Sequence, residues 1–156
     1  MAVTLTLEDI LKKAIDREIS SQRLYANLAQ KVTDKAAKDI FALLVKQERG
    51  HQLLLERYQH GELRGGALGR ETTIDYKITE HFYQPDITPD MPLPDIFLLA
   101  ANREKAAHDF YLDLAHVHPD GEIKTILRRL AREELGHKQR MEFLFSEVSF
   151  PQTSGG

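Results

Sequence analysis

Apolar residues recur at alternating intervals of three and four along four segments of the chain, which is the spacing of the buried face of an α-helix. The segments are residues 6–31, 34–61, 94–117 and 120–146. Thr6 and Asp9 have the spacing of a capping box at the start of the first segment. Asp34 and Asp120 stand where helix-capping residues are expected at the starts of the second and fourth. The pattern therefore predicts an all-α four-helix bundle.

The connections between the predicted helices are of two kinds. Tight turns join the first helix to the second and the third to the fourth, so each pair is expected to form an antiparallel hairpin. Residues 62–93 instead form a long link that is rich in glycine and proline. A link of this length is expected to cross the bundle from end to end. Within it, residues 73–83 are expected to form a short helix.

An internal repeat relates the two predicted hairpins. A shift of 86 residues brings matching residues of both hairpins into register. Glu18 and Tyr25 align with Glu104 and Tyr111, and Glu48-Arg49-Gly50-His51 aligns with Glu134-Leu135-Gly136-His137. Two copies of one helical hairpin predict a bundle with a pseudo-two-fold axis.

Each predicted buried face is apolar except near its middle. The interruptions are one glutamate in every helix and one histidine in the second and fourth: Glu18, Glu48, His51, Glu104, Glu134 and His137. The four glutamates lie equally far from their hairpin turns, so one common layer is expected. Four buried carboxylates repel each other and lose hydration, and no lysine or arginine falls in the central layer of any buried face. Two divalent ions with mixed carboxylate and imidazole ligands would neutralise them.

The spacing of these residues also decides how strongly the sequence indicates a metal site. A single Glu-x-x-His is weak, because this spacing also arises on charged helix surfaces. Two copies at the repeat offset, each with a partner glutamate, favour metal binding over a buried acidic layer without metal. Glu133 also lies one turn from His137, but the repeat aligns it with Gln47 and so favours Glu134 as the ligand. Iron is the expected metal, although manganese and zinc accept the same ligands.

Several other polar residues have more than one interpretation. Tyr25 and Tyr111 lie two turns from Glu18 and Glu104 on the same faces. They are either core aromatics or hydrogen-bond donors to a carboxylate of the facing helix. The remaining histidines are expected at the surface: His60, His81, His108, His116 and His118.

Composition narrows the class of protein. The chain has 156 residues, a net charge of −3 and no cysteine, so disulfides and zinc–thiolate sites are excluded. Basic and acidic residues are interspersed, which argues against a nucleic-acid or membrane partner. The start of the chain lacks the pattern of a signal peptide, and no apolar run reaches the ~18 residues of a membrane span. We expect a soluble, cytoplasmic protein with one domain at 1–150 and a tail at 151–156.

With these residues in place, the chain resembles the rubrerythrin-type branch of the ferritin-like superfamily over nearly all of its length. The resemblance lies in the repeated glutamate–tyrosine pairs and in the two Glu-x-Gly-His motifs. It implies that the six Glu/His residues bind two iron ions, with two glutamates bridging. It also implies that the two tyrosines hydrogen-bond carboxylates across the bundle. Proteins of this branch are typically dimers or larger and react with peroxide or dioxygen.

The chain departs from the rubrerythrin pattern in two ways. Full rubrerythrins carry a rubredoxin domain with a four-cysteine iron site, and this chain has no cysteine. An external electron donor, such as a rubredoxin-like protein, is therefore expected. Rubrerythrins also have an extra glutamate one turn after the third-helix ligand, where this chain has Ala107. The minimal six-ligand set is retained.

Three functions are compatible with this site. The first is a di-iron oxidoreductase that oxidises iron or reduces peroxide. The second is iron binding or storage without redox turnover. The third is a structural bundle in which metal ions only neutralise the buried carboxylates.

Overall fold

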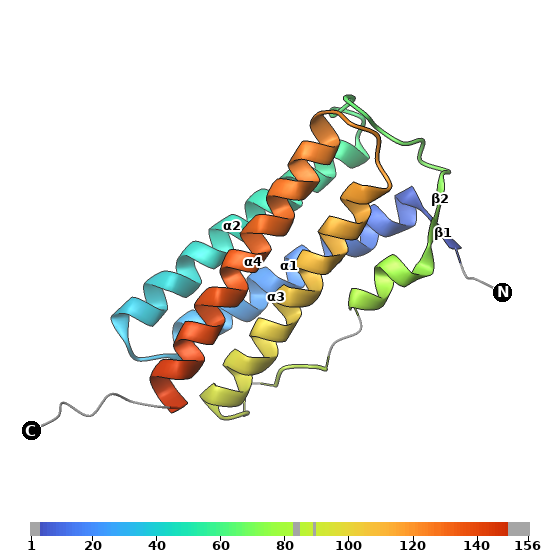
Figure 1. Ribbon diagram of the computed structural model, residues 1–156. Coiled ribbons are helices and arrows are strands. Elements are labelled where there is room, and N and C mark those ends of the chain that lie inside the picture. The colour runs from blue at the N-terminus through green and yellow to red at the C-terminus, as the bar shows by residue number, and fades with distance from the viewer. Residues whose placement is uncertain (1–3, 83–84, 89, 150–156) are drawn as a thin grey trace, which may run out of the picture.

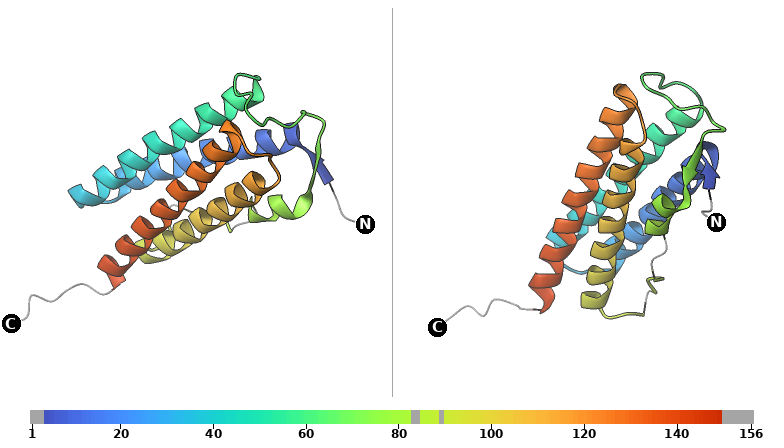
Figure 2. Two further views of the ribbon diagram at one scale, coloured as in Figure 1. Left: turned by 45° about the horizontal axis from the view of Figure 1, so that its top comes forward. Right: turned by 45° about the vertical axis from the view of Figure 1, so that its right-hand side comes forward.

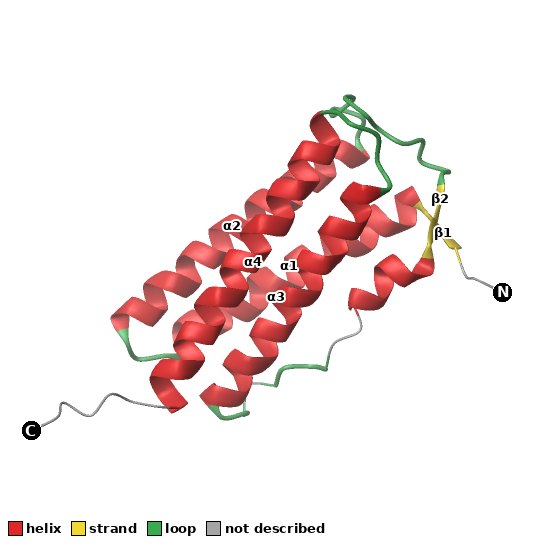
Figure 3. Ribbon diagram, in the orientation of Figure 1, coloured by secondary structure: helices red, strands yellow, loops and turns green. Residues whose placement is uncertain are grey.

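The computed structural model describes residues 4–82, 85–88 and 90–149 of the chain, without the side chain of Tyr76. Four long helices lie side by side as two antiparallel hairpins (Figure 1). The helices are α1 (Leu7–Lys31), α2 (Lys35–Gln59), α3 (Leu93–His116) and α4 (Glu122–Ser149). Helices dominate the described chain (Figure 3). The expected all-α bundle of two hairpins is confirmed.

The helix boundaries follow the capping residues, with one exception. The Thr6 hydroxyl and the Asp9 backbone and carboxylate form the expected capping box of α1, and Asp34 accepts the Ala37 N–H at the start of α2. The predicted start of the fourth helix at Asp120 is wrong, because α4 begins at Glu122. There the carbonyl of Gly65 accepts the Ile123 N–H at 3.0 Å, so backbone from the long link occupies the capping role.

The long link runs from the end of α2 to the opposite end of the bundle, where α3 begins (Figures 1 and 2). It contains a short strand and a 3₁₀ helix in place of the single short helix expected over 73–83. Strand β2 (Thr73–Asp75) pairs antiparallel with β1 (Thr4–Thr6), and η1 (Tyr76–Phe82) follows it. The end of the expected helix, Tyr83, lies outside the described residues. The Phe82 ring packs on Phe110 of α3, with 4.5 Å between ring centroids.

The start of the link also contacts the turn between α3 and α4. A Cβ added to Gly121 would lie 2.7 Å from the Gly65 carbonyl oxygen. Gly66 has a φ of 81°, a conformation that residues with a side chain rarely adopt. The glycines thus allow two backbone segments to touch, which holds the link against the end of the second hairpin.

The core consists of two apolar clusters with a polar layer between them. One cluster, near the turn between α3 and α4, includes Leu11, Leu55 and Leu114. The other, near the turn between α1 and α2, includes Phe41 and Phe97, whose rings stack at 5.9 Å. Water is therefore excluded from both sides of the polar layer.

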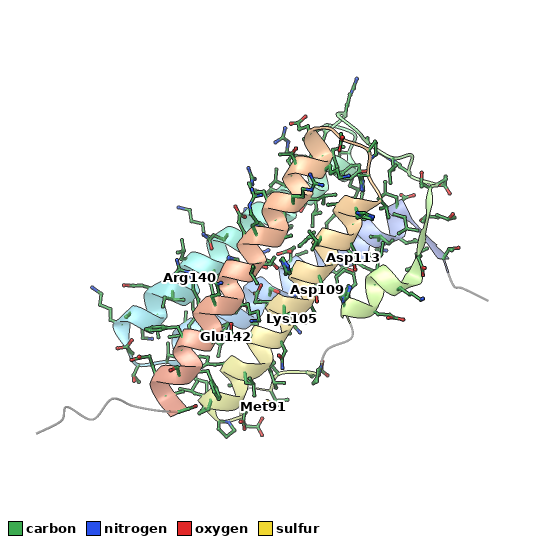
Figure 4. All side chains as sticks on the ribbon, in the orientation of Figure 1. Met91, Lys105, Asp109, Asp113, Arg140 and Glu142 are labelled. Carbon is green, nitrogen blue, oxygen red and sulfur yellow. The ribbon has the colours of Figure 1, made fainter. Side chains whose placement is uncertain are left out.

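Charged side chains cover the outer faces of the helices. Lys105, Asp109 and Asp113 follow one face of α3 at four-residue intervals (Figure 4), and Lys105 pairs with Asp109 at 3.5 Å. Within the described ranges, no helix has a stretch long and apolar enough to cross a membrane.

Candidate metal centre

The structure brings all six predicted Glu/His residues together between the two apolar clusters. Each helix supplies one glutamate, and α2 and α4 add the histidine one turn further on. None of the six side chains is more than 3% exposed: Glu18, Glu48, His51, Glu104, Glu134 and His137. The matched distances from the hairpin turns, read from the sequence, therefore correspond to one layer in space.

The six residues form two overlapping groups of possible ligand atoms. Glu18, Glu48, His51 and Glu134 form one group, and Glu48, Glu104, Glu134 and His137 form the other. In each group, one ligand atom from every residue lies within 4.8 Å of the others. Glu48 and Glu134 belong to both, so two neighbouring cations could share them.

The two imidazoles are oriented alike. Their rings are stacked, with 5.9 Å between centroids and 12° between planes. His51 Nε2 lies 2.6 Å from Glu133 Oε2, and His137 Nε2 lies 2.7 Å from Gln47 Oε1. Because these oxygens only accept, each Nε2 carries the proton, and each Nδ1 is directed toward the carboxylates. This is the tautomer in which a neutral imidazole presents its Nδ1 lone pair to a metal ion.

Unpartnered polar atoms test whether a metal fits. Seven buried side-chain nitrogen and oxygen atoms of the described residues make no hydrogen bond of acceptable geometry, although His137 Nδ1 lies 2.8 Å from Glu48 Oε1 and both Nδ1 atoms lie 3.2 Å from Glu134 Oε1. All seven belong to the cluster: Glu18 Oε2, both Glu48 oxygens, His51 Nδ1, Glu104 Oε2, Glu134 Oε1 and His137 Nδ1. Native proteins rarely leave buried polar atoms unpaired. Concentrated at one point, these atoms fit the hard oxygen and imidazole ligands of a divalent metal.

Two tyrosines fix the outer carboxylates. The Tyr111 hydroxyl of α3 donates to Glu18 Oε1 of α1 at 2.5 Å, and the Tyr25 hydroxyl of α1 donates to Glu104 of α3. Both tyrosines are 1% exposed. Of the two interpretations offered by the sequence, donation to a carboxylate of the facing helix is the one the structure shows. Each bond leaves the other carboxylate oxygen directed at the cluster.

The electrostatics of the cluster differ from residue to residue. Burial, together with repulsion from Glu134 and Glu18, raises the pKa of Glu48 well above its usual value. Burial also tends to raise the pKa of Glu134. The imidazoles of His137 and His51, whose Nδ1 atoms lie 3.2 Å from Glu134 Oε1, outweigh burial and hold this pKa well below its usual value.

Both imidazoles favour the protonated form. Burial lowers the pKa of each, but the Glu133 and Glu134 carboxylates, which accept from the protonated ring, raise the pKa of His51 to about 12. The Glu104 and Glu134 carboxylates likewise raise the pKa of His137 to about 9. The metal-free cluster therefore holds protons that a metal ion must displace.

The expectation that no arginine reaches the central layer is wrong. Arg17 Nη1 lies 3.4 Å from Glu134 Oε2, and Nη2 donates to the backbone carbonyl of Arg103 at 2.5 Å. Arg17 precedes Glu18 and so lies off the buried face, but its long side chain reaches around the helix into the layer. Arg17 offsets part of the negative charge, but the case for metal ions rests on the oxygen and imidazole atoms that converge in the layer, and those atoms remain directed at one another.

Glu133 lies in neither group of possible ligand atoms. Its side chain is 40% exposed, and its carboxylate accepts a hydrogen bond from Nε2 of His51. Gln47, its repeat partner, does the same for His137. The two residues share a role that the repeat alignment alone did not reveal.

The surface assignment of the other histidines is correct only for some. His60 and His116 are exposed, whereas His81 and His108 are half-buried. His118 is 2% exposed, so its predicted surface position is wrong. Its Nδ1–H donates to the Leu114 carbonyl, and its Nε2 accepts from the Tyr58 hydroxyl at 2.7 Å.

Known proteins resemble this chain in sequence and in fold. Residues 2–59 match the family model for rubrerythrin. A hypothetical protein from Pyrococcus furiosus shares 25% identity over 96% of this chain and 94% of its own, with a TM-score of 0.72. A protein from Thermotoga maritima assigned as a ferritin-like diiron-carboxylate protein shares 17% identity over 95% of this chain and 99% of its own, with a TM-score of 0.74. No curated protein matches the chain significantly.

These matches and the geometry lead to one conclusion. The rubrerythrin match covers the first hairpin, which supplies Glu18, Glu48 and His51. The fold likeness covers nearly the whole chain, and the buried Glu/His cluster supports a metal site. The chain therefore has the fold of these two proteins, and its first hairpin is similar to rubrerythrin.

Proposed function

We propose that this protein is a di-iron carboxylate oxidoreductase that reacts with peroxide or dioxygen. The observation that carries the proposal is the convergence of seven buried atoms without a well-formed hydrogen bond, all from the six Glu/His residues. The rubrerythrin match and the likeness to a diiron-carboxylate protein favour iron over manganese or zinc.

Each of the two overlapping groups of ligand atoms would hold one metal ion. Glu48 and Glu134, common to both groups, would help to hold both ions. Glu18 with His51 would complete one side, and Glu104 with His137 the other. Tyr111 and Tyr25 keep the outer carboxylates in position across the bundle.

Bound iron would supply the one-electron steps and coordination positions for an oxidant. The chain supplies the surroundings of that chemistry. The apolar clusters on both sides of the layer exclude bulk water. Glu133 and Gln47 hold the Nε2 protons of the imidazoles, so Nδ1 is the nitrogen left for the metal. Because metal ligands must be deprotonated, metal binding would release the protons that the carboxylates and imidazoles hold.

The sequence contains no cysteine, which bears on the source of electrons. The chain has no rubredoxin-type iron site of its own, so electrons would come from an external donor, such as a rubredoxin-like protein. We further expect a homodimer in the cytoplasm, with no nucleic-acid or membrane partner. Gel filtration with light scattering measures the oligomeric state directly.

Metal analysis and rapid mixing test the proposal. Protein produced in iron-replete medium is expected to contain about two irons per chain, and Glu48→Ala is expected to lose most of them. Stopped-flow mixing of the ferrous-loaded protein with peroxide is expected to show faster oxidation than free ferrous iron.

Other results of these experiments would support the alternatives. Iron uptake far beyond two ions per chain, with a cage-sized assembly, would indicate storage. Equal retention of zinc and no accelerated oxidation would indicate a structural metal site. Full iron content in Glu48→Ala would contradict the ligand assignment itself.

A further inference from the structure

A cleft of about 340 Å³ lies where α1, α3 and η1 meet. Its lining residues come from all three elements and include Lys13, Asp16 and Arg17 of α1, Arg103 of α3, and Phe82 of η1. A water molecule occupies ~30 Å³ in the liquid, and small-molecule sites begin at ~300 Å³. The cleft is therefore large enough for a small organic molecule.

Positive charge dominates this cleft. Lys13, Arg17 and Arg103 line it, against one carboxylate, that of Asp16. Among the ion pairs of the described residues, none includes Lys13 or Arg103. The side-chain hydrogen bond of Arg103 is a long one, 3.5 Å to Ser20 Oγ. Glu104 and Asp86 favour the charge of Arg103 from a distance, but a half-buried guanidinium without a carboxylate in contact is unusual, because burial of a charge needs compensation.

The two arginines also lie close enough to repel each other. Arg17 Nη2 donates to the backbone carbonyl of Arg103. Burial and the nearby charge of Arg17 lower the pKa of Arg103. An anion placed between the two side chains would relieve this repulsion, and its hydrogen bonds would compensate for the water that burial removes from the guanidinium groups.

Arg17 connects the cleft to the carboxylate layer. Its side chain is only 9% exposed, yet it lines the cleft and its Nη1 contacts Glu134 at 3.4 Å. A molecule bound against Arg17 would thus lie one side chain away from the candidate metal centre.

Phe82 gives the cleft an apolar side. Its ring is held against Phe110 of α3, with 4.5 Å between centroids. A ligand with an apolar body could pack on this fixed ring while its charged group reached the arginines.

We propose that this cleft binds a small organic anion, with one oxyanion group between Arg17 and Arg103 and an apolar body against Phe82. The planar guanidinium donors match either a carboxylate or a phosphate. Lys13, at the exposed side, adds attraction without a fixed geometry. The inference concerns binding to the chain itself and stands whether or not the di-iron proposal holds.

Calorimetric titration of the full-length protein with three probes tests the inference. Benzoate and phenyl phosphate carry an oxyanion on an aromatic ring, and benzyl alcohol is their neutral counterpart. We expect at least one anion to bind with a Kd below about 1 mM, and benzyl alcohol about tenfold more weakly. The stronger of the two anions identifies the preferred headgroup. Failure of both anions to bind at millimolar concentration would overturn the proposal.

Three substitutions locate the site. Arg103→Gln is expected to weaken anion binding about tenfold, and Lys13→Gln about threefold. Lys46→Gln is the matched control, because it removes one positive charge from an exposed position of α2 outside the cleft. Equal weakening by all three would show general charge attraction and overturn the proposal. Lys13 is exposed, so this variant remains informative if Arg103→Gln fails to fold.

Discussion

His51 of α2 donates its Nε2–H to the carboxylate of Glu133 on α4 at 2.6 Å. The corresponding bond in the other half of the repeat, from His137 to Gln47, ends on a neutral amide oxygen. An anionic acceptor makes an imidazole more basic and a stronger metal ligand than an amide does. The two halves of the candidate centre are therefore unequal, although their six ligand residues are the same.

This inequality can be measured through metal affinity. Glu133→Ala is expected to weaken binding at the His51 side by about 10–100-fold, and Gln47→Ala is expected to have a smaller effect at the His137 side. Competition with a chromogenic chelator gives both affinities. Glu147→Ala, an exposed glutamate of the same helix as Glu133, serves as the control. Equal losses in Glu133→Ala and Glu147→Ala would contradict the role of the hydrogen bond.

The two shared glutamates are expected to respond differently to substitution in the metal-free protein. Burial and repulsion raise the pKa of Glu48 well above its usual value, which favours the neutral carboxyl that glutamine resembles. Glu134 instead pairs with Arg17 and both histidines at 3.2–3.4 Å. Glu48→Gln should change the free energy of unfolding by less than about 1 kcal/mol, whereas Glu134→Gln should lower it by about 1–3 kcal/mol.

Chemical denaturation of the metal-free variants checks this difference, and both variants should lose metal affinity. A larger destabilisation by Glu48→Gln than by Glu134→Gln would contradict the assignment of the neutral carboxyl to Glu48 and of the charged carboxylate to Glu134.

Tyr111 offers a test of carboxylate positioning. Tyr111→Phe leaves Glu18 Oε1 buried without its donor, which should lower the free energy of unfolding by about 1–3 kcal/mol and weaken metal binding about tenfold. Tyr58→Phe is the matched control, because the Tyr58 hydroxyl also bonds to a buried partner, His118, outside the cluster. It should cost stability but leave metal affinity unchanged. If both variants bind metal equally well, the hydroxyl of Tyr111 does not position Glu18.

The sequence predicted the cluster because two independent patterns agreed. Helical spacing placed Glu18 and its counterparts on buried faces, and the repeat placed them at one height. Arg17 was missed because spacing assigns a residue to a face, whereas a long flexible side chain can leave that face. The pairing of β1 with β2 depends on segments that lie far apart in the chain and are only three residues long. Such short strands have no pattern that local reading can detect.

His118 was assigned to the surface for a similar reason, and its burial has a consequence for pH dependence. Burial lowers the pKa of His118, a Leu114 hydrogen bond opposes this, and nearby Lys124 lowers it further. As the pH falls through about 6.5, the unfolded chain takes up a proton before the folded protein does. The stability that neutral His118 contributes is therefore present above that pH and lost below it.

The variant His118→Gln removes this contribution. At pH 7.5 we expect it to be less stable than the unsubstituted protein by about 1–3 kcal/mol, with the difference shrinking at pH 5. Denaturant unfolding at both pH values measures it. A difference that stays constant would show that His118 does not titrate between the two states.

Gly121 tests the contact between the long link and the second hairpin. Alanine there would press its Cβ against the Gly65 carbonyl, so Gly121→Ala should lower the free energy of unfolding by about 1–3 kcal/mol. Gly136→Ala is the control, since a Cβ at this position of α4 meets nothing within 4 Å. It should stabilise the helix by up to about 1 kcal/mol. Thermal unfolding distinguishes them, and equal shifts would contradict the close approach.

The reciprocal bonds of the cluster bear on how the chain could be divided. Every supporting partner comes from the opposite hairpin: Tyr25 serves Glu104, Tyr111 serves Glu18, and Glu133 serves His51. Each hairpin thus carries three of the four residues of one ligand group, one residue of the other group, and none of the partners that support its own ligands. Two separately produced halves would have to associate before either ligand group is complete, so stoichiometric metal uptake would report their reassembly.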